Sequence, residues 1–152
     1  MGKYGEGVNY AKAADPKSDS IMDPGTLGGK VRVMQDYFTF PASTTMVSDN
    51  YILVGRKLPD GAQVVSIALS NGAVGTGTDS YLCVGDEGDV DRYITLVQST
   101  TAAVTTSINA YTGINYIVTG TTDNYIRVTG SASAVCINSG GTIKVSIMYV
   151  TE

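Results

Sequence analysis

Residues 142–150 read TIKVSIMYV, a run in which every second residue is large and apolar. Successive side chains of a β-strand point to opposite faces, so this alternation predicts a strand with one buried face. The residues expected to share that face are Ile143, Val145, Ile147 and Tyr149, and those between them are Lys144, Ser146 and Met148.

Shorter runs rich in Val, Ile, Thr and Tyr precede this strand and are separated by turn signals such as Pro59-Asp60-Gly61 and Asn71-Gly72. No helix-period segment lies between them, which favours antiparallel pairing over βαβ units. We therefore expect an all-β fold, an antiparallel β-sandwich that is most simply jelly-roll-like, with an immunoglobulin-like or up-and-down arrangement left open. The expected strands cover 30–40, 44–54, 63–70, 80–84, 92–98, 116–119, 125–129, 134–137 and 142–150, and residues 99–107 give the weakest signal.

The first 29 residues differ from this body. They are polar and Gly-rich and contain the steps Asp15-Pro16 and Asp23-Pro24, so they have too little apolar surface to offset the entropy of ordering. We expect an extended N-terminal arm over 1–29 and a β-sandwich domain over 30–152. The apolar side chains of the arm would bury themselves in a partner molecule, and these anchors are Tyr4, Tyr10, Ile21, Met22 and Leu27.

Composition limits the partners. The chain has 152 residues, enough for one core, and a net charge of −4 from ten basic and fourteen acidic residues. No cluster of basic residues forms the footprint that binds phosphates, so nucleic acid is not expected. No apolar stretch is long enough to span a bilayer, and residues 1–10 lack the apolar region of a secretory signal, so neither a membrane nor the usual export route is expected.

An enzyme is not expected either. The chain contains no histidine, which excludes Ser-His-Asp and Cys-His sites in their usual form. A carboxylate pair would need Asp36 or Asp49 beside Asp123, and nothing in the sequence brings them together. Cys83 and Cys136 lie in apolar runs typical of free, buried thiols, although a bridge between them stays open.

Residues 86–91 read DEGDVD and form the one concentrated charge cluster. Carboxylate oxygens suit Ca²⁺, which makes Asp86, Asp89 and Asp91 candidate metal ligands. Their spacing does not fit the EF-hand loop, and a solvated turn between two strands is the commoner structure for such a run. No other cofactor is expected.

Three stretches carry a resemblance to a known group of proteins: residues 23–33 (DPGTLGGKVRV), residues 57–62 (KLPDGA), and residues 83–86 (CVGD) with 91–94 (DRYI). Over nearly its whole length the chain resembles small virion proteins of tailed bacteriophages. The resemblance implies a non-enzymatic capsid decoration, or cement, protein. Such proteins are β-rich knobs, often trimeric, that bind the major capsid protein on the outer shell and brace neighbouring subunits. It also implies assembly in the cytoplasm of the host bacterium and a final location in the virion.

Two other functions remain open. One is a tail-fibre or surface domain that binds host carbohydrate through Tyr and Asn side chains in the loops 111–115 and 121–125. The other is a head-completion or tail component that uses the same β-domain in a ring.

Overall fold

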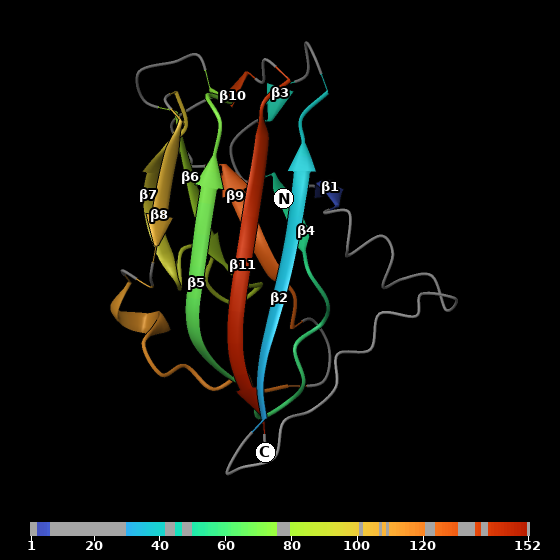
Figure 1. Ribbon diagram of the computed structural model, residues 1–152, viewed down its shortest axis with the longest axis vertical. Coiled ribbons are helices and arrows are strands. Elements are labelled where there is room, and N and C mark those ends of the chain that lie inside the picture. Colours follow the sequence, from blue (N-terminus) through green and yellow to red (C-terminus); the bar gives the residue numbers. More distant parts are fainter. Residues whose placement is uncertain are drawn as a thin grey trace, which may run out of the picture.

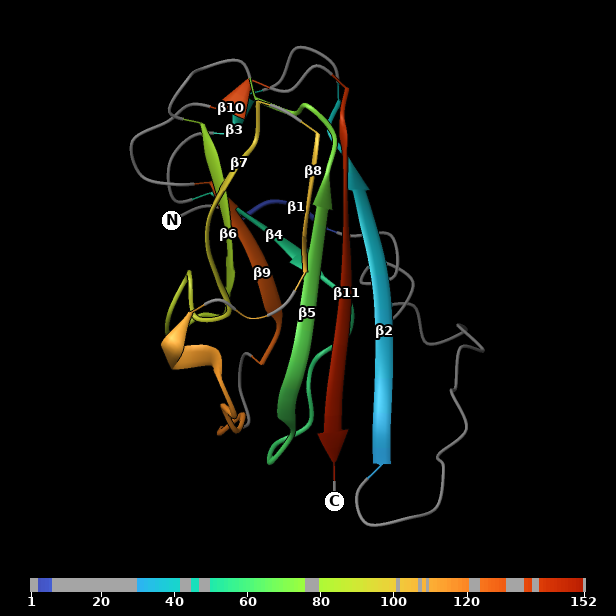
Figure 2. The same ribbon diagram turned by 60° about the vertical axis from the view of Figure 1, so that its left-hand side comes forward.

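The computed structural model shows two β-sheets packed face to face (Figures 1 and 2). The first has the strand order β1 (Lys3–Glu6), β4 (Tyr51–Val54), β9 (Ile126–Gly130), β6 (Tyr81–Gly85) and β7 (Ile94–Gln98). The second has the order β2 (Lys30–Thr39), β11 (Thr142–Thr151), β5 (Gln63–Asn71) and β8 (Ala103–Thr106). The structure describes residues 3–6, 30–41, 45–46, 50–75, 80–100, 102–106, 108, 110–120, 124–130, 136–137 and 140–151.

The antiparallel pairings are nested within one another. Strand β2 pairs with β11, β4 with β9, β5 with β8, and β6 with β7. The short strands β3 (Thr45–Met46) and β10 (Cys136–Ile137) also pair, and this pair falls between the β2–β11 and β4–β9 pairs in the nesting. The chain is thus one long hairpin, with the β6–β7 turn at its tip, that is rolled into two sheets. This winding is a jelly roll, which confirms the expected β-sandwich and excludes the immunoglobulin-like and up-and-down alternatives.

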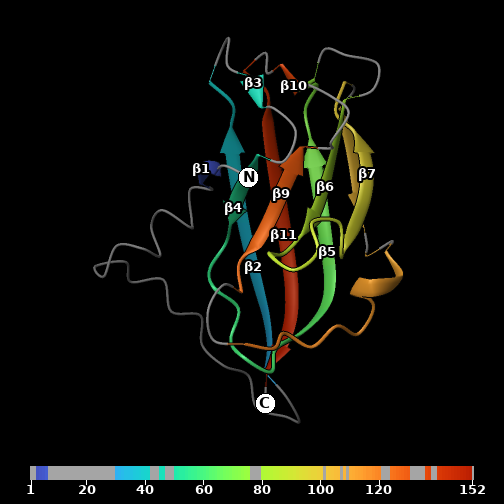
Figure 3. The same cartoon turned by 180° about the vertical axis from the view of Figure 1, so that it is seen from behind.

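The core lies between the sheets and is made by alternate residues of their strands. In β11 the inward residues are the predicted set, Ile143, Val145, Ile147 and Tyr149, each at most 7% exposed. Figure 3 shows the sheet that packs against them, seen from behind. Its inward side chains include Ile52, Val54, Leu82, Val84, Ile126 and Val128.

A buried carboxylate links the two sheets. Asp36 of β2 points inward and is 4% exposed. Its Oδ2 accepts a hydrogen bond of 2.8 Å from the amide of Gly55, which follows β4 in the opposite sheet, and its Oδ1 accepts one from the amide of Tyr37. Gly55 has a φ of +71°, a conformation that favours glycine. Asp36 is therefore held by backbone amides, whereas Asp123, its suggested partner, and Asp49, the suggested alternative to Asp36, lie outside the described residues.

The segment expected to be an arm includes a strand. Residues Lys3–Glu6 form β1, which pairs in parallel with β4 of the same chain. A Cβ at Gly5 would come within 2.5 Å of the Phe38 ring, so the absence of a side chain lets β1 approach β2 closely. The expectation that residues 1–29 have no place in their own subunit is therefore wrong for these four residues. Residues 7–29 lie outside the described residues.

Three strand assignments differ from the sequence-based prediction. Residues 116–119 were expected to be a strand, but Ile117 makes a single bridge to Gln63. The weakly signalled residues 99–107 contain β8. Within 44–54, β3 and β4 are separate strands that pair with different partners.

We predict that Asp36→Ala lowers the free energy of unfolding by about 1–3 kcal/mol, because it leaves buried amides without their acceptor. Urea denaturation followed by circular dichroism measures this. Lys144→Ala, an exposed change on the outer face of β11, is the control and should stay within about 0.5 kcal/mol of the parent protein. Equal effects of the two substitutions would contradict the role assigned to Asp36.

Candidate functional site

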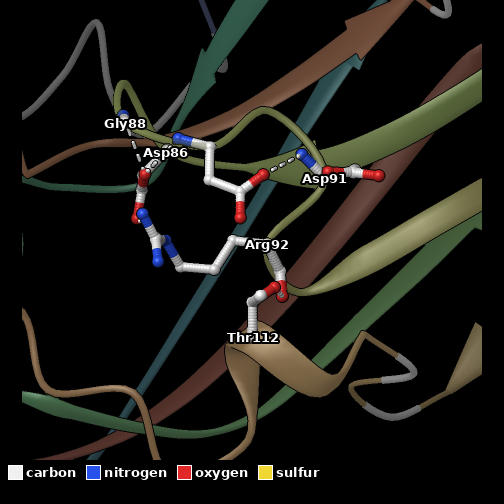
Figure 4. Close-up of polar contacts among 6 residues, drawn as sticks. Asp86, Gly88, Asp91, Arg92 and Thr112 are labelled. Carbon is white, nitrogen blue, oxygen red and sulfur yellow. Dashed lines mark hydrogen bonds and ion pairs between the residues drawn. The ribbon is translucent and has the colours of Figure 1, made fainter.

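The tip of the rolled hairpin is the acidic turn between β6 and β7, and Asp86 organises it. Its Oδ1 accepts hydrogen bonds from the amides of Gly88 at 2.9 Å and Asp89 at 3.0 Å. Its Oδ2 accepts one of 2.6 Å from Nε of Arg92. Figure 4 shows Arg92 turned back toward Asp86 across the turn. The turn is closed by its own ion pair and amides.

Arg92 also contacts an aromatic ring. Its guanidinium carbon lies 3.9 Å from the centre of the Tyr116 ring, which is a cation–π contact. Burial tends to lower the pKa of Arg92, but the hydrogen bond and charge of Asp86 raise that pKa overall. The charge on Arg92 is therefore already matched within the site.

Asp89 and Asp91 form a carboxyl pair on the outer side of the turn. The Asp91 amide donates to Oδ1 of Asp89 at 3.4 Å. The pKa of Asp91 is raised above its ordinary value, first by a hydrogen bond with the Asp89 side chain, then by burial, then by the Asp89 charge. Asp91 therefore holds a proton more tightly than an isolated aspartate does.

The segment around η1 (Tyr111–Gly113) packs against the turn. Thr112 Oγ1 donates to the carbonyl of Arg92 at 3.1 Å, as drawn in Figure 4, and the Ala110 amide donates to the carbonyl of Tyr93. A Cβ at Gly113 would come within 2.3 Å of the Arg92 carbonyl, so only glycine permits this approach. Residues nearly twenty positions apart are thereby held together.

A cavity of about 250 Å³ lies between the turn and the residues that lead into β9. Its wall includes the side chains of Tyr93, Tyr116 and Tyr125, and its polar lining includes Asp86, Arg92 and Asn124. Nδ2 of Asn124 donates to the carbonyls of Gly120 at 2.6 Å and Leu58 at 3.4 Å, which fixes that amide. None of these groupings was predicted from the sequence, because the residues come from distant segments.

A second ion pair lies nearby. Nη2 of Arg127 is 3.5 Å from Oε1 of Glu87, and the Arg127 guanidinium carbon is 4.4 Å from the centre of the Tyr51 ring. Arg127 is only 4% exposed although it points to the outer face of β9. Both acidic residues at the start of the turn therefore have an arginine partner.

The predicted metal ligands do not converge. Within the described part of the chain, no group of three or more Asp, Glu, Cys or His side chains is arranged to hold a metal ion. Both carboxylate oxygens of Asp86 already accept hydrogen bonds from its own turn. Oδ1 of Asp89 accepts a hydrogen bond from the Asp91 amide.

The other candidate residues have mixed outcomes. Cys83 is a free, buried thiol that donates to the Thr129 carbonyl, so it does not form a bridge with Cys136. The backbone of Tyr4 lies in β1. Tyr10, Ile21, Met22 and Leu27 lie outside the described residues, and their role as anchors stays a prediction.

Exposed apolar side chains gather on the outer face of the second sheet. We define the sheet-face patch as Val31, Val33, Val65, Met148 and Val150. Met148 is opposite Val33 and Val150 is opposite Val31 in the β2–β11 register. Val31 is 60% exposed, Val65 42% and Met148 39%. A further group, Tyr111, Ile114 and Ile117, is exposed near η1. Exposed apolar side chains of this kind make both groups candidate contact sites.

No helix in the described residues is long and apolar enough to cross a membrane.

Comparison with known proteins identifies the fold. No family model matches this chain, and no curated protein sequence matches it significantly. The structure is similar to a chain of the cyanophage Pam1 capsid asymmetric unit, with a TM-score of 0.66 and 24% identity over 91% of this chain and 100% of that one. It is also similar to a chain of the capsid of Ralstonia phage GP4, with a TM-score of 0.61 and 15% identity over 100% and 97%. The predicted likeness to bacteriophage virion proteins is therefore confirmed at the level of the fold.

We predict that Asp86→Ala lowers the free energy of unfolding by about 1–3 kcal/mol, since it removes the acceptor of two amides and of Arg92. Chemical denaturation measures the change. Glu87→Ala is the matched control, because its longer and more exposed ion pair is worth at most about 1 kcal/mol. A loss no larger than that of the control would show that Asp86 does not organise the turn.

A pH dependence follows from the Asp89–Asp91 pair. Because the folded pKa of Asp91 is raised above the ordinary 3.8, its contribution to stability is present below that value and is lost as the pH rises through the folded pKa. Asp91→Asn removes the repulsion, so we expect a higher melting temperature than the parent at pH 7 and no difference below the ordinary pKa. Calorimetry across this pH range tests it, and a gap independent of pH would contradict the pairing.

Proposed function

We propose that this chain is a non-enzymatic structural protein of a bacteriophage virion, and more specifically a decoration protein that binds the outer capsid surface and braces neighbouring capsid subunits. The fold shared over nearly full length with chains of two phage capsids carries this proposal. Those chains are matched over 100% and 97% of their length, so they are similar in length to this chain.

The arrangement of the molecule supports a role in assembly. The sheet-face patch surrounds the start of β2 and the end of β11, where Lys30 pairs with Thr151. The predicted arm, residues 1–29, is joined in the chain to the start of β2 at Lys30. In this proposal the patch and the arm act together. This is the construction that a protein bridging other subunits needs.

The patch suits self-association. Strand β2 is an edge strand of ten residues, and a long open edge is usually covered in native proteins. Association of copies through the sheet face, in a trimer, would bury Val31, Val65 and Met148. The major capsid protein would then be the partner of the arms.

Trivalency would supply the strength of binding. Burial contributes about 25 cal/mol per Å², and ordering costs leave one short arm only weakly bound. After one arm of a trimer binds, the other two act at high effective concentration, which raises avidity by about 10² to 10⁴. Such a clamp would hold capsid subunits against the pressure of the packaged genome.

The test uses capsids of the parent phage that lack this protein. We predict that the full chain with Tyr10, Ile21, Met22 and Leu27 all changed to Ser keeps its fold and oligomeric state but loses at least 100-fold in capsid affinity, measured by cosedimentation. Cryo-electron microscopy of capsids with the parent chain should show the domain on the outer surface.

Met148→Lys is the complementary variant. It should dissociate the oligomer in sedimentation velocity, because it places a charge in the sheet-face patch. The control Leu96→Lys on β7, where the parent side chain is 58% exposed against 39% for Met148, should not. Capsid binding that survives the arm substitutions, or density in the tail, would refute the decoration role.

A further inference from the structure

Exposed apolar side chains are concentrated on one side of the molecule. Of the eight large apolar side chains that are exposed in the described residues, only Leu96 lies away from the outer face of the second sheet and the segment that continues it. The other seven are Val31, Tyr37, Val65, Tyr111, Ile114, Ile117 and Met148. So uneven a distribution of exposed apolar surface indicates an interface.

The segment after η1 extends the outer face of the second sheet. Val150 of β11 is opposite Gln63 of β5, and Gln63 is bridged in turn to Ile117. Opposite residues of antiparallel strands point to the same face, so Ile117 joins the row of Val150. Ile114 and Tyr111 continue the exposed apolar surface beyond this row.

Tyr111 projects from that surface on a fixed support. Its side chain is 92% exposed, whereas Oγ1 of the next residue, Thr112, donates to the Arg92 carbonyl at 3.1 Å and holds η1 to the body. Figure 1 shows η1 at the margin of the sandwich. We call Tyr111 and Ile114 the η1 projection. Exposed aromatic side chains on rigid supports are common anchors of protein interfaces.

A groove of about 380 Å³ lies on the outer face of the second sheet. Its lining includes the small side chains of Ala68, Ser70 and Ser146, with the larger Tyr37 and Lys144 beside them. The volume is within the roughly 300–1,000 Å³ of pockets for drug-sized molecules, so one tyrosine ring fits.

The charges near the two surfaces are of opposite sign. Among the outward side chains of β2, β11 and β5, all of them within the described residues, Lys144 is the one that carries a charge. Asp89 and Asp91 belong to the acidic turn that packs against η1. A weakly charged centre with complementary charges around it is typical of an interface, and such charges orient the encounter of the partners.

Symmetry decides how these surfaces combine. A patch that packs against the same patch of a second copy makes a contact that closes at two copies, whereas a ring of three requires two different surfaces on each copy. The trimer proposed above therefore needs a surface complementary to the grooved sheet face. The η1 projection has the shape, the apolar character and the neighbouring charge for this.

We propose that the η1 projection of one copy inserts into the groove of the next copy, with the Tyr111 ring over Ala68 and Ser146 and with Ile114 against the sheet-face patch. Three such contacts close the trimer. The occupant of the groove is thus a second copy of this chain. This inference rests on the self-association in the proposed function and is tested without capsids.

The experiment is sedimentation velocity of the full chain and two variants. The parent should sediment at about three times the 15.9 kDa of one chain. The projection variant, Tyr111→Ser with Ile114→Ser, removes the anchors, and the groove variant, Ser146→Arg, fills the groove. Each variant alone should lose the trimer and sediment as a monomer with the far-ultraviolet circular dichroism of the parent, because surface substitutions rarely affect the fold. Ala68→Arg replaces Ser146→Arg if the latter loses that spectrum.

Mixing the two variants in equal amounts distinguishes this contact from a face-to-face one. The groove variant keeps its projection and the projection variant keeps its groove, so one intact contact forms and a 1:1 complex of about twice the mass of one chain should appear. Identical patches packed on each other offer no such complementation. Leu96→Ser and Gln98→Arg, exposed on β7 in the other sheet, are the matched controls and should keep the trimer.

Three results would overturn the proposal: a monomeric parent, a trimer that survives either variant, or two monomeric variants that do not complement each other. A groove variant that stays trimeric but no longer cosediments with capsids would assign the groove to the capsid protein instead. Absent complementation with intact capsid binding refutes only this contact, whereas complementation without capsid binding refutes only the decoration role.

Discussion

The pairing of β11 with both β2 and β5 is the interaction on which the rest of the structure depends. Strand β11 lies between β2 and β5, and it pairs with β2 over ten residues. Thr39 and Thr142, which share a side-chain hydrogen bond at one end of this ladder, are 103 residues apart. Until β11 is in place neither the second sheet nor the core is complete, so this topology folds through long-range contacts.

The nested pairing also explains where the polar contacts of the acidic turn and the cavity beside it are located. A hairpin rolled on itself has one tip, and here the tip is the acidic turn, whose charges are satisfied by Arg92 and by its own amides. The roll brings η1 and the residues before β9 against that tip. A rigid corner with a small cavity results, although the contributing segments are separated by long stretches of chain.

The sheet-face patch and the cavity beside the acidic turn lie on different sheets. The patch is on β2, β11 and β5, and the cavity is formed by the β6–β7 turn and the approach to β9. Association of copies through the patch would therefore not involve the residues that line the cavity. The hydrogen bond from the Gly55 amide to Asp36 links the two sheets.

Several features follow from local sequence alone. The alternation in 142–150 predicted which face of β11 is buried, because side chains of a strand alternate whatever the partner. The Pro59-Asp60-Gly61 turn was also evident, and Gly61 has the positive φ of 78° that such a turn requires.

Other features needed the tertiary structure. Strand β8 has few apolar residues, and β1 was hidden in a polar, Gly-rich segment, so both form because a neighbouring strand offers backbone partners. The inward position of Asp36, the pairing of Asp86 with Arg92 and the cavity around Tyr93 likewise arise from packing, since burial and contact between distant residues depend on how the sheets meet and leave no periodic signal in the chain.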